Sequence, residues 1–188
     1  MSDLARKMDE IILKISPEAQ KGLDNLLVYK ELRKESFLLS EGQVCQNCFI
    51  IQEGVARKFT RSEDKELTTE LYFKDDLAVS FESFCYQKSS TEFIQAITDL
   101  KVVQINFGSF QKLKSEFPEL VQLDLAIAEY YTIWLEKRFM EFRTQSAAQR
   151  YLNLIAREPR YLKHLKLTII ASYLGISLET LSRIRSKI

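Results

Sequence analysis

The pattern of apolar and polar positions is sharpest at the C-terminal end of the chain, in residues 167–188. Two short stretches of helical periodicity meet at Gly175, a residue that takes the left-handed backbone conformation cheaply and so ends helices. Ser177 follows as an N-cap, because its hydroxyl can accept from the first free N–H groups of the next helix. Apolar residues fall where the two helices would meet each other and the core, at Ile170, Leu174, Ile176, Leu181 and Ile184. The pattern predicts a helix-turn-helix.

The second helix of this unit turns polar side chains to solvent, where they can reach the edges of DNA bases. The candidate DNA contacts are Ser177, Leu178, Glu179, Ser182, Arg183 and Lys187. An ordinary helical hairpin is the alternative, because short amphipathic helices joined by glycine are common. The combination of the small residue Ala171, the glycine turn and the serine cap favours the DNA-reading unit.

The longest helical pattern begins at Pro118 and continues to about Phe142, and it carries two apolar faces. The first face repeats at alternating steps of three and four, as in a paired helix, at Leu120, Leu123, Ile127, Tyr130 and Trp134. The second face carries Val121, Leu125, Ala128, Leu135, Phe139 and Phe142. One face can lie against the rest of the chain while the other pairs with a second copy, and we assign the first face to the dimer interface. A helix buried wholly in one monomer is the alternative.

Between residues 28 and 107 the pattern changes to short β-type runs separated by turn signals. Candidate strands cover residues 27–33, 36–39, 48–52, 55–61, 67–73, 93–97 and 102–107. Many short strands at even spacing predict an antiparallel barrel, sandwich or roll. Helices are expected at residues 3–14, 17–27, 108–116 and 144–158, with a single helical turn at 81–87.

Charge is distributed unevenly along the chain. The formal net charge is +1, but residues 143–188 carry +7 and the rest of the chain carries −6. A basic C-terminal part on an acidic body favours attraction to a phosphate backbone at one end. The start of the chain lacks an apolar signal core, and no apolar run has membrane-spanning length. Three cysteines and one histidine are too few for a disulfide framework, so we expect a cytoplasmic protein.

Catalytic and metal-binding patterns are sparse. Cys45 and Cys48 form a single C-x-x-C, and the other candidate ligands, Cys85 and His164, are distant in sequence. Buried structural cysteines are favoured over a zinc site or a redox pair. No nucleophilic triad, P-loop or paired-carboxylate motif is present, so we expect no enzyme activity, no metal and no certain cofactor.

A β-rich N-terminal part, a long helix and a C-terminal helix-turn-helix together resemble the Crp/Fnr superfamily of bacterial transcription regulators. The most specific similarity lies in residues 175–183, Gly-Ile-Ser-Leu-Glu-Thr-Leu-Ser-Arg, which look like the start of that family's recognition helix. Residues 49–54, Phe-Ile-Ile-Gln-Glu-Gly, are similar to a strand and turn of its β-roll. The resemblance implies an α+β fold with an N-terminal antiparallel β-roll of the jelly-roll type. It further implies a sensor domain with N-terminal helices at 1–117, a dimerisation helix at 118–142 and a helix-turn-helix domain at 143–188 that lacks an evident wing.

The stretch of residues 79–99 departs from the family members that bind cyclic nucleotides. Those members carry a Gly-Glu pair for the ribose and an Arg for the cyclic phosphate, whereas the arginine position here is Ser90 or a neighbour. Lys88 is the only nearby cation, and an ammonium is a poor substitute for a bidentate guanidinium. We therefore expect that cyclic AMP is not the effector. If an unknown small-molecule effector binds, the candidate contacts are Glu82, Lys88, Ser89 and Ser90.

The predicted function is a homodimeric, sequence-specific DNA-binding transcription regulator. Its expected partners are double-stranded DNA and a second copy of the chain, with RNA polymerase as a further candidate and no membrane partner. The alternative is a sensor module for a small molecule or a protein, with a vestigial helix-turn-helix. The lack of a β-hairpin wing before Ile188 motivates this alternative, through either an absent wing or a truncated sequence.

Overall fold

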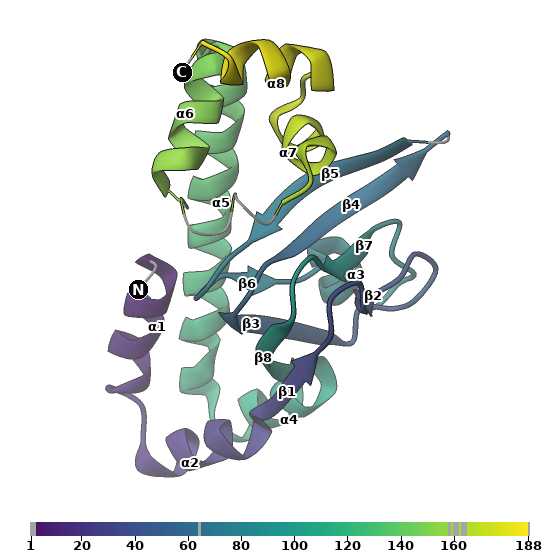
Figure 1. Ribbon diagram of the computed structural model, residues 1–188. Coiled ribbons are helices and arrows are strands. Elements are labelled where there is room, and N and C mark those ends of the chain that lie inside the picture. Colours follow the sequence, from purple (N-terminus) through teal and green to yellow (C-terminus); the bar gives the residue numbers. More distant parts are fainter. Residues whose placement is uncertain (1–2, 64, 158, 160–161, 163–164, 188) are drawn as a thin grey trace.

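One long helix forms the spine of the molecule in this computed structural model, which describes residues 3–63, 65–157, 159, 162 and 165–187. This helix, α5 (Val121–Thr144), has the β-rich part on one side and α1 (Asp3–Ile12) alongside it, as Figure 1 shows. The helix-turn-helix lies at the C-terminal end of α5, and α2 (Pro17–Leu26) lies at the opposite end of the molecule. The N-terminal end of α5 therefore lies near α2, and its C-terminal end lies near the helix-turn-helix.

Eight strands form two antiparallel sheets of four strands each within the described residues. The first sheet has the order β1-β8-β3-β6, and its strands are β1 (Val28–Leu32), β8 (Leu100–Asn106), β3 (Asn47–Glu53) and β6 (Leu77–Ala78). The second has the order β2-β7-β4-β5, with β2 (Phe37–Leu39), β7 (Phe93–Ala96), β4 (Ala56–Ser62) and β5 (Lys65–Tyr72). The predicted antiparallel β-roll is confirmed. Only β6, a strand of two residues, has no counterpart in the prediction.

The two sheets enclose an apolar core between their facing sides. The core contains Leu39, Phe49, Ile51, Ala56, Tyr72, Ile94, Leu100 and Val102, all buried. Gly54, in the turn between β3 and β4, has a φ of +96°, and a Cβ there would lie 2.2 Å from the carbonyl oxygen of Asp99. Only glycine fits this turn, because the conformation and the close backbone approach both exclude a side chain.

A second core joins the N-terminal helices to the beginning of α5. The helices α2, α4 (Phe107–Glu116) and the short 3₁₀ helix η1 (Pro118–Leu120) pack together there. Ser16 caps α2 by accepting from the Ala19 N–H at 3.3 Å, and Asn106 caps α4 by accepting from the Ser109 N–H at 3.1 Å. The buried members of this core are Ile15, Ala19, Leu23, Leu113, Leu120 and Leu123.

The prediction that assigns the first apolar face of α5 to the dimer interface requires correction. Leu120 is 0% exposed and Leu123 is 3% exposed, so both are buried within a single chain. Ile127, Tyr130 and Trp134 continue this face, and they are partly buried beside Leu4 of α1 and the β-roll. The second face is the exposed one, with Val121, Leu125, Leu135, Phe139 and Phe142 all more than 40% exposed. Spacing alone does not separate the faces, because both satisfy the same helical periodicity.

The C-terminal unit consists of α6 (Ala147–Arg157), α7 (Leu167–Leu174) and α8 (Leu178–Arg185). Gly175 has a φ of +66° and ends α7, and Ser177 caps α8 by accepting from the Thr180 N–H at 3.1 Å. Both features are as predicted from the sequence. The core of this unit also includes Val55, Leu71, Phe73 and Ile97 from the β-roll, so the two parts share one buried cluster. The predicted basic linker around His164 lies largely outside the described residues.

Candidate nucleic-acid interface and sensor site

The outer face of α8 is accessible to solvent along its whole length. All six residues predicted to contact DNA are exposed on α8 or at its ends: Ser177, Leu178, Glu179, Ser182, Arg183 and Lys187. The helix is held from its inner side by Leu181, which is fully buried. Arg183 donates to the Thr180 hydroxyl at 3.3 Å, within the same helix. This arrangement leaves the guanidinium free to turn toward a partner outside the protein.

Two arginines attach the helix-turn-helix to the end of α5. Arg138 on α5 donates to the carbonyl oxygen of Tyr173 at 2.6 Å, and Arg150 on α6 donates to that of Leu174 at 3.0 Å. These oxygens end α7, where cations are favoured by the helix dipole. Both guanidinium groups also lie over the ring of Phe142, at 4.6 Å and 4.9 Å. A movement of α5 would therefore carry the reading unit with it.

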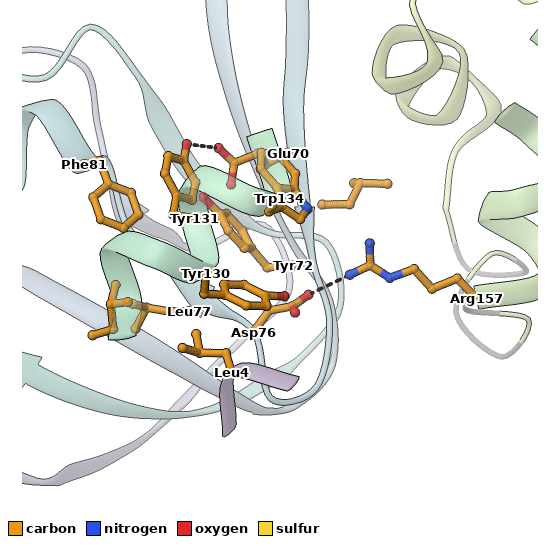
Figure 2. A pocket seen from close by; sticks show the side chains of 12 residues that line it. Leu4, Glu70, Tyr72, Asp76, Leu77, Phe81, Tyr130, Tyr131, Trp134 and Arg157 are labelled. Atoms are coloured by element: carbon orange, nitrogen blue, oxygen red, sulfur yellow. Dashed lines mark hydrogen bonds and ion pairs between the residues drawn. The ribbon is translucent and has the colours of Figure 1, made fainter. Parts of the chain in front are cut away.

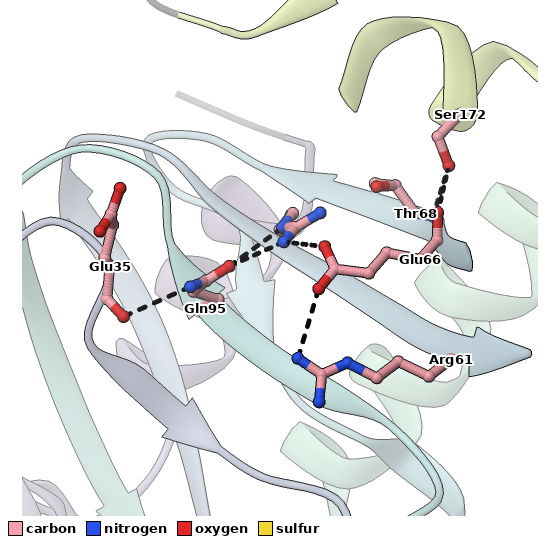
Figure 3. Close-up of polar contacts among 7 residues, drawn as sticks. Glu35, Arg61, Glu66, Thr68, Gln95 and Ser172 are labelled. Atoms are coloured by element: carbon pink, nitrogen blue, oxygen red, sulfur yellow. Dashed lines mark hydrogen bonds and ion pairs between the residues drawn. The ribbon is translucent and has the colours of Figure 1, made fainter. Parts of the chain in front are cut away.

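Ser172 on α7 connects the helix-turn-helix to the edge of the second sheet (Figure 3). Its hydroxyl accepts from the Thr68 N–H at 2.8 Å and donates to the Glu66 carbonyl oxygen at 3.1 Å. Since β5 is an edge strand, these backbone groups have no neighbouring strand to pair with. The Ser172 hydroxyl thus bonds two backbone groups of β5 that a further strand would otherwise pair with.

The Glu66 side chain continues this connection into the sheet, as Figure 3 shows. Its carboxylate accepts from Arg57 at 2.6 Å and from Arg61 at 3.3 Å. Burial alone raises the pKa of the Glu66 carboxyl, but the two arginines outweigh it and lower that pKa below its ordinary value. Arg57 also donates to Gln95 at 2.8 Å, so the polar chain crosses from β5 through β4 to β7.

A buried lysine forms the centre of an ionic cluster in the second sheet. The Lys58 side chain is 4% exposed, and its Nζ lies 2.6 Å from Glu70 Oε1 and 3.5 Å from Glu92 Oε1. Burial lowers the pKa of the Lys58 ammonium, but the two carboxylates outweigh this effect and raise the pKa above its ordinary value. We call Lys58, Glu70 and Glu92 the ionic triad.

The ionic triad is hydrogen-bonded to both neighbouring helices. Tyr131 on α5 donates to Glu70 Oε1 at 2.9 Å, and Ser80, just before α3 (Phe81–Tyr86), donates to Glu92 Oε2 at 2.5 Å. Burial and the neighbouring Glu70 carboxylate raise the pKa of Tyr131 to about 12, so its hydroxyl stays a donor at neutral pH. Tyr131 stacks on Phe81 at 4.2 Å, and Figure 2 shows this aromatic group beside Glu70.

A cleft of about 410 Å³ lies next to the ionic triad, between the β4–β5 hairpin, α5 and α7. Its walls include all three residues of the triad together with Tyr131, Trp134, Arg138 and Ser172. The residues that bind the helix-turn-helix therefore line the same cleft as the buried charges. A separate pocket of about 40 Å³, shown in Figure 2, is lined by Tyr131 and by Asp76 and Arg157, which form an ion pair at 3.8 Å.

Comparison with known proteins finds a family match over part of the chain and several solved structures of similar fold. Residues 29–117 match the cyclic nucleotide-binding domain family. FixK2 from Bradyrhizobium japonicum is similar in structure, with a TM-score of 0.69 and 18% identity over 86% of this chain and 83% of that one. The c-di-GMP-responsive regulator CLP of Xanthomonas campestris has a TM-score of 0.68 and 12% sequence identity, over 92% of this chain and 91% of that one. A CooA mutant from Carboxydothermus hydrogenoformans has a TM-score of 0.65 and 18% sequence identity, over 88% of this chain and 78% of that one.

The chain has the Crp/Fnr fold. The fold that the resemblance implied is thereby confirmed. No curated protein matches the chain by sequence. Among the described residues, no helix has both the length and the apolar character that a membrane crossing requires.

Within this Crp/Fnr fold, the four residues predicted as effector contacts do not form one buried site. Glu82 and Lys88 form an exposed ion pair at 2.5 Å, and Ser89 is exposed as well. Only Ser90 is buried, where its hydroxyl accepts from the Glu92 N–H at 3.0 Å. The ionic triad, which the sequence reasoning missed, takes the interior position instead. The sequence shows only that a lysine and a glutamate lie on neighbouring predicted strands. The strand register is needed to place Lys58 opposite Glu70.

Two of the three cysteines in this Crp/Fnr fold are buried side chains. Cys45 and Cys48 are buried and Cys85 is exposed, with no disulfide among them. Burial raises the pKa of the Cys48 thiol to about 12, which makes it a poor ligand and a poor nucleophile. No group of three potential metal ligands occurs in the part of the chain that the structure describes, and His164 lies outside that part.

Proposed function

We propose that this chain is a homodimeric, sequence-specific DNA-binding transcription regulator. The observation that carries the proposal is the exposed polar face of α8 on a helix-turn-helix fixed to the end of α5. A solved structure with this fold, CLP, is described as a global regulator that links cell–cell signalling to virulence gene expression. The family that matches residues 29–117 is a cyclic nucleotide-binding domain family, which supports a regulator rather than an enzyme.

The second apolar face of α5 is the proposed dimer seam. It is formed by Val121, Leu125, Ala128, Leu135, Phe139 and Phe142, and the polar residue Thr132 completes the steps of four and three between them. This is the spacing that keeps one face of a helix against a parallel partner helix. A row of exposed apolar side chains of this length is costly in water, and a second copy would cover it. Because the reading unit is fixed to α5, pairing would also orient the two copies of α8.

The interior of the β-roll does not suit a cyclic phosphate. Lys58 is buried there and is already paired with Glu70 and Glu92. A phosphate brought beside these two carboxylates would meet net repulsion at low effective dielectric. We expect no rise in melting temperature of the protein with millimolar cyclic AMP, measured by differential scanning fluorimetry. A saturable rise would contradict this part of the proposal.

Replacing Arg183 by alanine tests the assignment of α8 to base reading. A bidentate contact from arginine to guanine is worth about 1–3 kcal/mol of base discrimination. We therefore expect Arg183→Ala to weaken binding to a selected site by about that amount and to change binding to random DNA much less. Titration of labelled duplexes at fixed salt measures both. Arg33→Ala is the matched control, because Arg33 is exposed on the β-roll and carries the same charge.

Equal losses of Arg183→Ala on specific and random DNA would show a phosphate contact and remove the base-reading role. Equal losses in Arg183→Ala and Arg33→Ala would show a general effect of net charge. Absence of any DNA binding by the intact protein at low salt would contradict the proposed function itself. A stable protein partner in that case would favour the sensor module with a vestigial helix-turn-helix.

Replacing Ser172 by alanine tests the connection between α7 and β5. The substitution removes both hydrogen bonds and leaves the Thr68 N–H and the Glu66 carbonyl without that partner. We expect the Thr68 amide to exchange faster with deuterium, and the free energy of unfolding to fall by about 1–3 kcal/mol. Ser115→Ala is the control, because Ser115 bonds only to a carbonyl of its own helix at 2.7 Å. Unchanged exchange at Thr68 would show that the connection does not hold in solution.

A further inference from the structure

We propose that the interior of the β-roll is a carboxylate-binding site that the chain's own Glu92 occupies as a built-in ligand. The site consists of Lys58 and Ser80, with the Ser90 hydroxyl beside Ser80, and it adjoins the cleft between the sensor and the reading unit. Glu92 keeps the site filled without a diffusible effector. A chain that lacks this side chain should therefore bind small free carboxylates in its place. Ligand binding at this site in the β-roll does not depend on DNA binding by α8.

The surroundings of the Glu92 carboxylate are those of a bound ligand. One oxygen accepts from the Ser80 hydroxyl at 2.5 Å, and the other lies 3.5 Å from the Lys58 ammonium. A hydroxyl and an ammonium converging on the two oxygens of one carboxylate are the groups by which proteins bind free acids. The Lys58 side chain is 4% exposed and that of Glu92 is 22% exposed, so this is not a solvated surface pair.

The backbone of Glu92 is fixed so that its side chain reaches this position. The Ser90 hydroxyl accepts from the Glu92 N–H at 3.0 Å and donates to the Glu92 carbonyl oxygen at 3.1 Å. The same hydroxyl lies 3.2 Å from the Ser80 hydroxyl. Ser80 and Ser90 are both buried, so the two serines and Glu92 form one preorganised cluster. Preorganisation of this kind lowers the entropic cost of holding a ligand in place.

The site is connected to the parts of the molecule that would respond to it. Lys58 pairs with Glu70, which accepts from Tyr131 on α5. The cleft of about 410 Å³ borders Lys58 and Glu92 on one side and Ser172 and Arg138 on the other. A small acid can reach the triad through this cleft once the Glu92 side chain is absent. Occupation of the site would then stabilise the arrangement of β4, β5 and α5 described here.

The experiment is thermal unfolding of Glu92→Ala in added sodium formate or acetate, against sodium chloride at the same ionic strength. Removal of the carboxylate should lower the melting temperature by about 4–8 °C, as expected for the loss of an internal ionic partner in a protein of this size. Formate or acetate should restore at least half of this loss with a saturating dependence on concentration. Sodium chloride should not restore it, and the wild type should respond equally to all three salts.

The matched control is Glu82→Ala, which removes a carboxylate of the same kind from the exposed pair with Lys88. This variant should show no specific response to formate or acetate. Equal responses in the two variants, or no response in Glu92→Ala, would overturn the proposal. If Glu92→Ala does not fold in chloride, recovery of folded protein in formate supports the proposal and failure in both salts overturns it. None of these readouts depends on DNA, so the proposed function can fail or stand separately.

Discussion

Replacement of Phe139 by glutamate should convert the protein from a dimer to a monomer and weaken its binding to a two-fold symmetric DNA site by about 10²–10⁴-fold. Phe139 is 62% exposed in the single chain and lies near the C-terminal end of the proposed seam, so its loss does not disturb the monomer core. Two glutamates facing each other across the seam repel, and the apolar contact is lost as well. A monomer engages one half-site at a time and loses the gain in effective concentration.

Sedimentation velocity gives the oligomeric state, and titration of labelled duplex gives the affinity. Met140→Glu is the matched control, because Met140 is 50% exposed and lies one residue along α5, outside the seam. This variant should stay dimeric and bind DNA as the wild type does. A dimeric Phe139→Glu protein would contradict the seam. A monomeric one with full affinity would show that pairing is not needed for DNA binding.

Replacement of Lys58 by methionine should lower the free energy of unfolding by about 3–5 kcal/mol, as breaking a buried ion pair from one side does. Methionine preserves most of the lysine stem but leaves Glu70 and Glu92 together without their cation. Chemical denaturation at neutral pH measures the loss. Lys88→Met is the control: Lys88 pairs with Glu82 at the surface, and its removal should change stability little.

The stability deficit of Lys58→Met should depend on pH in a defined direction. Without the ammonium, the two carboxylates of the triad are left close together at low effective dielectric, where their negative charges repel. This charge repulsion destabilises the folded state most at high pH and less as the pH falls. The deficit relative to wild type should therefore be smaller at pH 5 than at pH 7.5. A deficit independent of pH would show that packing, rather than charge, causes the loss.

The helix-turn-helix was predictable because its signals are local. Gly175 must take a positive φ, and a Cβ there would also lie 3.0 Å from the ring of Phe142. Ser177 caps the next helix within the same short stretch. Such requirements are visible in a few consecutive residues, and the strands of the β-roll follow similarly from runs separated by turns. β6 escaped prediction because two residues carry no periodicity.

The two faces of α5 and the ionic triad were not predictable in the same way. Both faces of α5 have coiled-coil spacing, and only the packing of the N-terminal helices shows that Leu120 and Leu123 belong inside the chain. The triad joins Lys58 on β4 to Glu92, which lies just before β7 and far from Lys58 in sequence, and the pairing of β4 with β7 brings the two together. Glu82 and Lys88, both exposed, were chosen because residues 79–99 correspond to the nucleotide-binding stretch of the resembled family. Long-range pairing decides both outcomes, and a single sequence does not display it.

In the proposed complex, two copies of the chain present their α8 helices to neighbouring major-groove faces of one duplex. Selection of a binding site from random DNA with the intact protein, followed by hydroxyl-radical footprinting of the complex, tests this arrangement. We expect a 2:1 complex with two symmetric half-sites centred about 10–10.5 base pairs apart, or roughly 34–36 Å. One protected half-site under a single chain, or no selected site at low salt, would contradict it.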